Sequence, residues 1–297
     1  MTLKKFLFGF GFVAMVLTLL PLIPADYWWI RMFDFPHIQL TTLTFLAILA
    51  FCIKFDFWNK KDFLFIILLV LCFVFQFFKI APYTPFFKKE VMDATKTDDK
   101  FKIKLLTANV LQKNENNDIL MDVIRELDSD IMIFTEANNQ WKDAIVKNLS
   151  SEYKYKVELP LENTYGILLY SKLELIDPQL KFMVTDSIPS IHTKFRLPSG
   201  EIAQLYAVHP TPPMPQENPL STDRDAELMM TSKLSRASEI PVIVIGDFND
   251  IPWSSTTRLF QKTSELLDIR VGRGFYNTFN AKKYLLRWPL DHIFCFA

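Results

Sequence analysis

The sequence predicts an α+β domain that is attached to a membrane by three amino-terminal helices. Apolar residues make up 50% of the 297 positions, and they crowd into the first eighty. From about residue 101 onward, short apolar runs alternate with amphipathic segments, a pattern typical of strands and helices in a soluble domain. We therefore expect a membrane anchor at residues 1–80, a linker at 81–100 and a soluble domain at 101–297.

Three apolar stretches form the predicted anchor, at about residues 6–23, 38–55 and 63–80. Each is close to the roughly 17 to 25 residues with which a helix crosses a bilayer core. Their interiors carry no charge, and aromatic residues flank them as they do at membrane interfaces; these are Tyr27, Trp28, Trp29 and Trp58. The stretches therefore favour transmembrane helices over buried helices of a soluble protein.

Basic residues in the short loops predict the orientation of the anchor. Two lysines precede the first stretch and three join the second to the third, whereas the first loop holds only Arg31. Because cytoplasmic loops are enriched in Lys and Arg, the amino terminus should be cytoplasmic and the domain extracytoplasmic, on an inner or plasma membrane. Three further lysines on the domain side oppose this orientation: Lys79, Lys88 and Lys89. A cleaved signal peptide is the alternative for the first stretch, but the stretch is long and lacks a clear small-residue cleavage site.

Residues 81–100 are first interrupted by prolines and then charged, as in a linker. Beyond them, two helices are expected, at 114–130 and 222–238. The expected strands lie in the apolar runs that start near residues 101, 130, 165, 191, 201 and 241. "PSG" at 198–200 indicates a hairpin between two of these strands.

Four of the expected strands end in a polar side chain that can serve a metal or a phosphate: Asn109, Glu136, His209, and Asp247 with Asn249. If the strands lie side by side, these ends meet at one edge of a sheet. Carboxylate and amide oxygens are the ligands that Mg²⁺ accepts, and a neighbouring His can donate to a phosphoryl oxygen. For any one of these residues alone, a turn is the simpler explanation, because Asn and Asp favour turns. Their recurrence along one domain favours a common site.

The order of these residues resembles the endonuclease/exonuclease/phosphatase superfamily. The resemblance covers about residues 102–297, and its most specific pieces are "GDFN" after four apolar residues and "TEAN". It implies a deoxyribonuclease I-like four-layer α/β/β/α sandwich. The arrangement of several apolar helices ahead of such a domain is similar to that of a membrane-anchored bacterial branch of the superfamily.

The resemblance also implies roles for individual residues. Glu136 would be the main ligand of Mg²⁺, or of Mn²⁺ in its place, with Asn109 beside it. Asp247 would activate the attacking water, while Asn249 and His209 would contact the scissile phosphate. Tyr165, beside the Gly of "YGILLYSK", would touch the phosphate or simply pack in a turn. Arg224 would reach a phosphate or lie in the first turn of a surface helix.

The motif "PLDHIF" near the end of the sequence leaves two interpretations open. In the first, Asp291 is the acid that orients a catalytic His, His292 is incidental, and the Ser-Asp-His motif of the superfamily is missing from a truncated chain with an exposed sheet edge. In the second, Asp291 and His292 are themselves the catalytic pair. An Asp-His pair would hold the required imidazole tautomer in both cases.

These observations predict a membrane-anchored, Mg²⁺-dependent hydrolase of phosphate esters, either monoesters or diesters. Its expected partners are the membrane and a phosphate-ester substrate: a phospholipid head group, a nucleic acid or a small phosphoester. Lys plus Arg equals Asp plus Glu at 33 each, so the overall charge gives no sign of nucleic-acid binding. The alternative is a catalytically inactive, membrane-tethered binding module of the same fold. The oligomeric state is left open.

Overall fold

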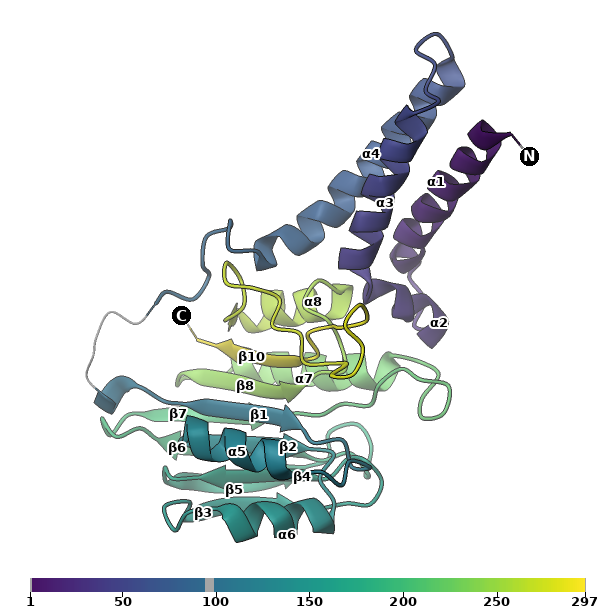
Figure 1. Ribbon diagram of the computed structural model, residues 1–297. Helices are drawn as coiled ribbons and strands as arrows, with labels where there is room; N and C mark the ends of the chain where they lie inside the picture. Colours follow the sequence, from purple (N-terminus) through teal and green to yellow (C-terminus); the bar gives the residue numbers. More distant parts are fainter. Residues whose placement is uncertain (1, 94–98, 297) are drawn as a thin grey trace.

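A computed structural model describes residues 2–93 and 99–296, in which three long helices project from an α+β domain (Figure 1). The helices are α1 (Leu3–Leu19), α2 (Trp28–Arg31), α3 (His37–Cys52), α4 (Lys60–Ile80), α5 (Asp118–Leu127), α6 (Asn139–Asn148), α7 (Thr222–Arg236) and α8 (Ser255–Ser264). Four short 3₁₀ helices supplement them: η1 (Leu20–Leu22), η2 (Met32–Asp34), η3 (Ala81–Tyr83) and η4 (Asp99–Phe101). Residues 94–98 of the predicted linker lie outside the described residues.

The strands form two sheets. The four-stranded sheet has the order β1-β2-β4-β3, and the six-stranded sheet has the order β5-β6-β7-β8-β10-β9. The bounds are β1 (Leu105–Asn109), β2 (Ile131–Thr135), β3 (Tyr155–Leu159), β4 (Ile167–Ser171), β5 (Leu175–Lys181), β6 (Ser190–Arg196), β7 (Ile202–Ala207), β8 (Val242–Asp247), β9 (Leu267–Asp268) and β10 (Asp291–Cys295). Two pairs are parallel, β1 with β2 and β7 with β8, and the other neighbouring strands are antiparallel.

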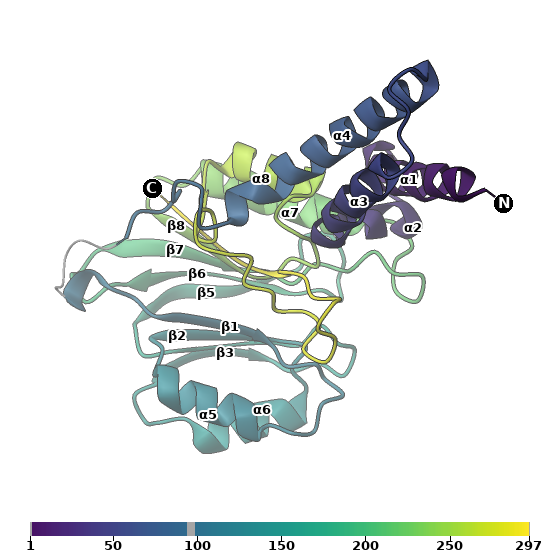
Figure 2. The same ribbon diagram turned by 45° about the horizontal axis from the view of Figure 1, so that its top comes forward.

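The domain has four layers, as the predicted α/β/β/α sandwich requires. The two sheets face each other, α5 and α6 cover the outer face of one, and α7 and α8 cover the outer face of the other (Figure 2). Central strands are therefore buried on both faces. In β2, Ile131 and Ile133 enter the core between the sheets, while Met132 and Phe134 pack against α5 and α6. This two-sided burial explains why β2 and β8 are continuous apolar runs rather than alternating ones.

The predicted domain helices are confirmed at α5 and α7. Among the helices and strands of the domain, α6, α8 and the strands β3, β5 and β9 were not predicted from the sequence. The apolar residues of α6 and α8 are few, since Trp141 and Ile145 in α6 and Phe260 in α8 supply most of the contact with the core. Such a small apolar face gives only a weak helical pattern.

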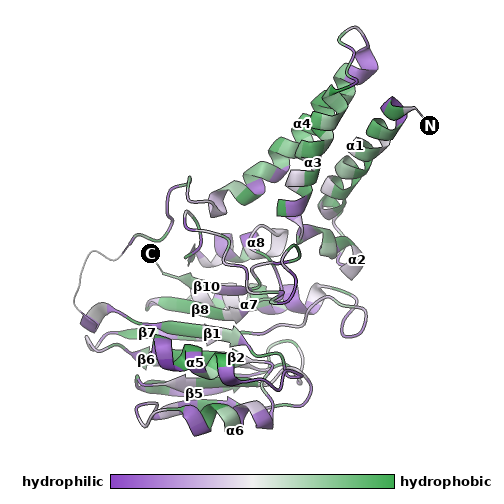
Figure 3. Ribbon diagram, viewed as in Figure 1, coloured by the Kyte–Doolittle hydropathy of each residue, from purple (hydrophilic) through white to green (hydrophobic). Residues whose placement is uncertain are grey.

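Two or three of the apolar helices could span a membrane. Leu3–Leu22 and Lys60–Tyr83 are long and apolar enough on their own. The second predicted span, residues 38–55, corresponds to α3, which counts as a third span only if it is taken together with Trp28–Asp34, from which it is bent by 71°. The hydropathy of α1, α3 and α4 contrasts with that of the domain (Figure 3).

Polar contacts join the three helices to one another. The Gln76 amide of α4 donates to the Thr18 hydroxyl of α1, and the Thr44 hydroxyl of α3 lies 3.3 Å from the Gln76 carbonyl oxygen. Lys4 and Asp62 form an ion pair of 2.6 Å between α1 and α4. Interhelical hydrogen bonds of this kind hold apolar helices together in a bilayer, where water offers no alternative partner.

The helices are also packed onto the domain. Ile80 and Tyr83 at the end of α4 share an apolar cluster with Ile251, Trp253 and Leu290 of the domain. The Tyr83 hydroxyl donates to the Pro252 carbonyl (3.1 Å), and the Trp253 indole donates to the Asp34 carbonyl (2.9 Å). Each fully buried large apolar side chain contributes about 1.5–3 kcal/mol, so this junction holds the helices and the domain as one unit.

The buried carboxyl group of Glu227 in α7 makes the stability of the domain depend on pH. Its side chain is 3% exposed, and its Oε1 has no hydrogen-bond partner among the described residues. Burial raises the pKa of Glu227 from 4.5 to about 8. Between pH 4.5 and pH 8 the folded protein keeps a proton that the unfolded chain releases. The free energy of unfolding should therefore fall by about 1.4 kcal/mol for each unit by which the pH rises through this range.

We predict that Glu227→Gln removes much of this loss of stability at alkaline pH. The measurement is the thermal midpoint of the detergent-solubilised chain at pH 5 and pH 8. Glu126→Gln, at an exposed position of α5, should keep the wild-type pH dependence. An identical decline with pH in Glu227→Gln and wild type would contradict the assignment.

Candidate active site

The carboxyl ends of the two parallel strand pairs meet at one edge of the sandwich. Asn109 closes β1, Glu136 follows β2, and Asp247 closes β8. His209 comes two residues after β7. β10 begins with Asp291 and runs antiparallel to β8. Side chains far apart in the sequence are therefore gathered by the register of the strands.

Asn109 joins two of the carboxylates. Its amide nitrogen donates to Glu136 Oε1 at 2.7 Å and to Asp247 Oδ2 at 2.9 Å. The amide oxygen accepts from the backbone N–H of Leu111 (2.9 Å), which fixes the orientation of the group. The Asn109 amide thus lies between two negative charges, where hydrogen-bond donors or a cation are favoured.

Asp291 adds a third carboxyl group. In the register of β8 and β10, Asp291 is directly opposite Asp247, and side chains paired in this way lie on the same face. Burial, followed by the charge of Asp247, raises the pKa of Asp291, and Glu136 adds to the effect. Asp291 Oδ1 has no hydrogen-bond partner among the described residues. The edge of the sandwich therefore carries a concentration of negative charge.

Left-handed backbone conformations direct the side chains of this edge toward one another. Glu136 has φ 57°, and Asn249 has φ 49°, values that few residues other than Gly adopt. Strict alternation along β2 would send Glu136 toward α5 and α6, and the left-handed conformation instead brings its carboxylate to Asn109. Gly246 has φ 137°, and a Cβ atom there would lie 2.1 Å from the Val208 carbonyl oxygen. Gly is therefore required before Asp247.

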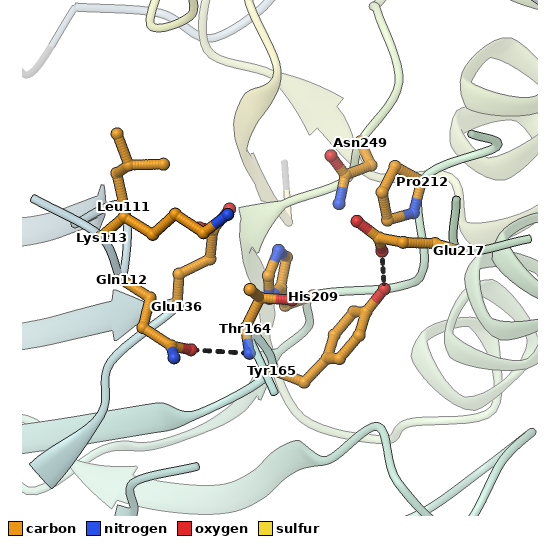
Figure 4. Close-up of a pocket in the computed structure, with 10 residues that line it drawn as sticks. All are labelled: Leu111, Gln112, Lys113, Glu136, Thr164, Tyr165, His209, Pro212, Glu217 and Asn249. Carbon is orange, nitrogen blue, oxygen red and sulfur yellow. Dashed lines mark hydrogen bonds between the residues drawn. The ribbon is translucent and has the colours of Figure 1, made fainter. Parts of the chain in front are cut away.

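His209, Tyr165 and Glu217 form the opposite wall of the site. They line a cavity of 220 Å³ together with Glu136 and Asn249 (Figure 4). The Tyr165 hydroxyl donates to the Glu217 carboxylate, and its ring lies 5.6 Å from the His209 ring. Burial and the hydrogen bond to Glu217 raise the pKa of Tyr165. His209 is 3% exposed, and its Nδ1 has no partner among the described residues.

Asn249 is held from both sides. Its backbone N–H donates to Asp247 Oδ1 at 2.8 Å, and its side-chain amide donates to the Pro210 carbonyl at 2.9 Å. Arg224 Nη1 donates to the Asn249 carbonyl at 3.0 Å and pairs with Asp250 at 3.5 Å. Arg224 is 1% exposed, so it supports the "GDFND" loop from behind rather than facing the cavity.

His292 lies away from these residues. Successive residues of a strand point to opposite faces, so Asp291 faces the carboxylates while His292 faces α8. Its ring stacks on Phe248 at 4.5 Å, Arg270 Nη2 contacts its Nδ1 at 2.5 Å, and its Nε2 lies 2.9 Å from the Asp250 carbonyl. Burial and the charge of Arg270 lower the pKa of His292 well below its usual value. This placement favours the first interpretation of "PLDHIF", in which His292 is incidental, because the ring packs against Phe248 and Arg270 rather than beside the carboxylates.

The remaining predicted residues are brought together: Asn109, Glu136, Asp247 and Asp291 in one group, and Tyr165, His209 and Asn249 around the cavity. Their chemical roles stay predictions. Sequence reasoning missed Gln112, Lys113 and Glu217, which also line the cavity. These residues lie in loops, away from the strand ends and sequence motifs on which the prediction of the site was based.

The residues present fit a divalent cation with few protein ligands. Within the described ranges, no three His, Cys, Asp or Glu side chains form a group able to hold a metal ion. Mg²⁺, however, commonly takes only one or two carboxylates and keeps several of its waters. Glu136 and Asp247 supply two carboxylates, which accept hydrogen bonds from the Asn109 amide and, at Asp247, also from the Asn249 N–H. Glu136 and Asn109 therefore remain suitable ligands.

We predict that Asn109→Asp destabilises the chain in the absence of divalent cations. The substitution replaces two charge-assisted hydrogen bonds with repulsion between carboxylates, at a cost of about 3 kcal/mol or more. The measurement is the thermal midpoint in EDTA. Asn114→Asp, in the exposed loop after β1, is the matched control and should change it little. Equal midpoints for the two variants would contradict the bridging role of Asn109.

Comparison with known proteins agrees with this architecture. Residues 106–297 match the profile of the Endonuclease/Exonuclease/phosphatase family. No curated protein sequence matches the chain.

Three solved structures illustrate the similarity of fold. A D. rerio TDP2 complexed with single-strand DNA product is 16% identical, with a TM-score of 0.54 over 65% of this chain and 83% of that one. A β-hairpin deletion mutant of the beta toxin from Staphylococcus aureus is 16% identical, with a TM-score of 0.51 over 67% and 87%. A mannosyl-6-phosphatase of Bacteroides thetaiotaomicron is 13% identical, with a TM-score of 0.50 over 65% and 85%.

Proposed function

The chain belongs to the Endonuclease/Exonuclease/phosphatase family, and from this premise we propose that it is a membrane-anchored, divalent-metal-dependent phosphoesterase. The observation that carries the proposal is the group of three carboxyl groups at the sheet edge, with the Asn109 amide between Glu136 and Asp247. Beside this group, the cavity offers the Asn249 amide, the His209 ring and the Lys113 ammonium. Negative charge that needs a cation, next to donors that suit a phosphate, is the arrangement that hydrolysis of phosphate esters requires.

In this proposal each residue has one task. Asp247, fixed by Asn109 and by the Asn249 N–H, orients a water and takes its proton. The Asn249 amide and the His209 ring bind the phosphate, since both face the cavity (Figure 4). Arg224 positions Asn249 by holding its carbonyl group. When bound by Glu136 and Asn109, the divalent metal would neutralise charge on the phosphate and on the leaving oxygen.

The charged side chains at the rim of the cavity and its volume indicate which substrates would fit. Lys113 supplies a positive charge for the phosphate, and Glu217 supplies a negative charge beyond it, held by Tyr165. A cavity of 220 Å³ suits one phosphate ester with a short substituent rather than a long polymer within it. The proposed substrates are a phospholipid head group, the end of a nucleic acid or a small phosphoester.

We predict that Asp247→Ala and Glu136→Ala each abolish Mg²⁺-dependent hydrolysis of a nitrophenyl phosphodiester or monoester. Loss of a general base alone lowers turnover by about 10²- to 10⁴-fold. Asp122→Ala and Glu126→Ala, at exposed positions of α5, are the matched controls and should retain wild-type rates.

Unchanged turnover in both site variants would refute the assignment of the site. Binding of Mn²⁺ without hydrolysis of either ester by the wild-type chain would favour the alternative, a catalytically inactive membrane-tethered module.

We further propose that the domain faces the extracytoplasmic side of an inner or plasma membrane, with the α3–α4 loop in the cytoplasm. Lysines at positions 4, 5, 54, 60 and 61 support this orientation. In a chain whose three native cysteines are replaced by Ser, a Cys introduced as Asn114→Cys should react with an impermeant maleimide in intact cells. Lys54→Cys should react only after the cells are lysed. The reverse pattern would contradict the orientation.

A further inference from the structure

A second cavity lies where the apolar helices meet the domain. It has a volume of 370 Å³ and is separate from the catalytic cavity, with which it shares no lining residue. Its apolar walls come from η1 and the segment after it, from Phe75 of α4 and from Trp253 of the domain. Its charged walls are Arg31, Asp34, Lys79 and Arg258. Arg258 belongs to α8, which lies on the side of the domain that faces the helices (Figure 1).

The charges of this cavity do not balance. Arg31 is paired with Asp34 at 3.3 Å, and it also donates to the backbone carbonyls of Ala25 and Ile23. Lys79 and Arg258 have no carboxylate within ion-pair distance among the described residues. The Lys79 ammonium lies 5.1 Å from the Phe75 ring, and the carboxylate that acts on it most strongly, Asp34, is already paired with Arg31. The charged side chains that line the cavity, three basic and one acidic, therefore leave a net positive charge.

The cavity also has a defined depth relative to the membrane. Leu22 and Tyr83 end the two helices that could span a bilayer on their own, and both ends lie at the domain. The cavity is lined by Leu22 itself and by Lys79, one turn before Tyr83. If these helices span the membrane, Lys79 and Arg258 lie at the level of the lipid head groups, and the apolar wall faces the start of the acyl chains.

We propose that this cavity binds the phosphate group of an anionic membrane lipid. Lys79 and Arg258 hold the phosphate, and Leu22, Ile23 and Phe75 contact the glycerol and the first methylene groups. Lys and Arg are the side chains that pair with phosphate, and basic pockets between membrane helices suit lipid head groups. The lipid joins α4 to α8 and so fixes the domain against the bilayer. This site is distinct from the catalytic cavity, and the proposal does not depend on hydrolytic activity.

The test is lipid binding by the full-length chain in neutral detergent with EDTA, so that no metal-dependent hydrolysis consumes the probe. Native mass spectrometry counts bound phosphatidylglycerol, diacylglycerol with the same acyl chains, and inorganic phosphate. Phosphatidylglycerol should bind at one tight site, and diacylglycerol about tenfold or more weakly, because charge-assisted contacts are lost.

The double variant Lys79→Gln/Arg258→Gln should raise the Kd for phosphatidylglycerol about tenfold or more. The control Lys61→Gln/Lys262→Gln removes one charge from the other end of α4 and one from the next turn of α8, and it should leave the Kd within about twofold. Lys79→Arg/Arg258→Lys should retain binding, which separates lost charge from misfolding.

Equal Kd values for the double variant and its control would overturn the proposal. Tight binding of inorganic phosphate that displaces the lipid would overturn it as well, since the ligand would then be free phosphate.

Discussion

The structure of the candidate active site depends on one electrostatic constraint, the placing of three carboxyl groups at one edge of two packed sheets. The antiparallel register of β8 and β10 sets Asp247 opposite Asp291, an arrangement that like charges disfavour. Asn109 donates to Glu136 of its own four-stranded sheet and to Asp247 of the facing six-stranded sheet. The repulsion that remains would be relieved by a cation, which links the stability of this edge to the proposed chemistry.

The surrounding chain is organised to hold these groups in place. Glu136 and Asn249 adopt left-handed conformations, which are costly and common at functional sites. Arg224 holds the carbonyl of Asn249, Ser254 caps α8 by accepting from the Thr257 N–H, and Asp250 accepts from the Ser254 and Thr257 hydroxyls. Trp253, four residues after Asn249, donates to the Asp34 carbonyl in η2, between the apolar helices α1 and α3. One short loop therefore connects the catalytic edge, α8 and the apolar helices.

Much of this architecture could be predicted because its signals are local. Strands buried on both faces give unbroken apolar runs, and the polar residues that close them, such as Asn109 and Asp247, stand out against those runs. His292 could not be placed in this way, since one residue of register decides whether it faces the site or α8. Glu217 and Lys113 come from loops, whose positions depend on tertiary contacts. The role of Arg224 depends on its burial. The sequence does not show this burial, because Arg224 lies among other charged residues in the first turn of a helix, where an exposed side chain is expected.

The central claim is that the carboxylates of this edge bind a divalent metal, and thermal unfolding of the full chain with Mg²⁺ or Mn²⁺ tests it directly. A ligand that binds only the folded state raises its stability by about 2.7 kcal/mol at one hundred times the Kd. The account predicts a higher thermal midpoint with metal for the wild-type chain and a much smaller rise for Glu136→Gln. No rise in the wild-type chain, or the same rise in both, would contradict it.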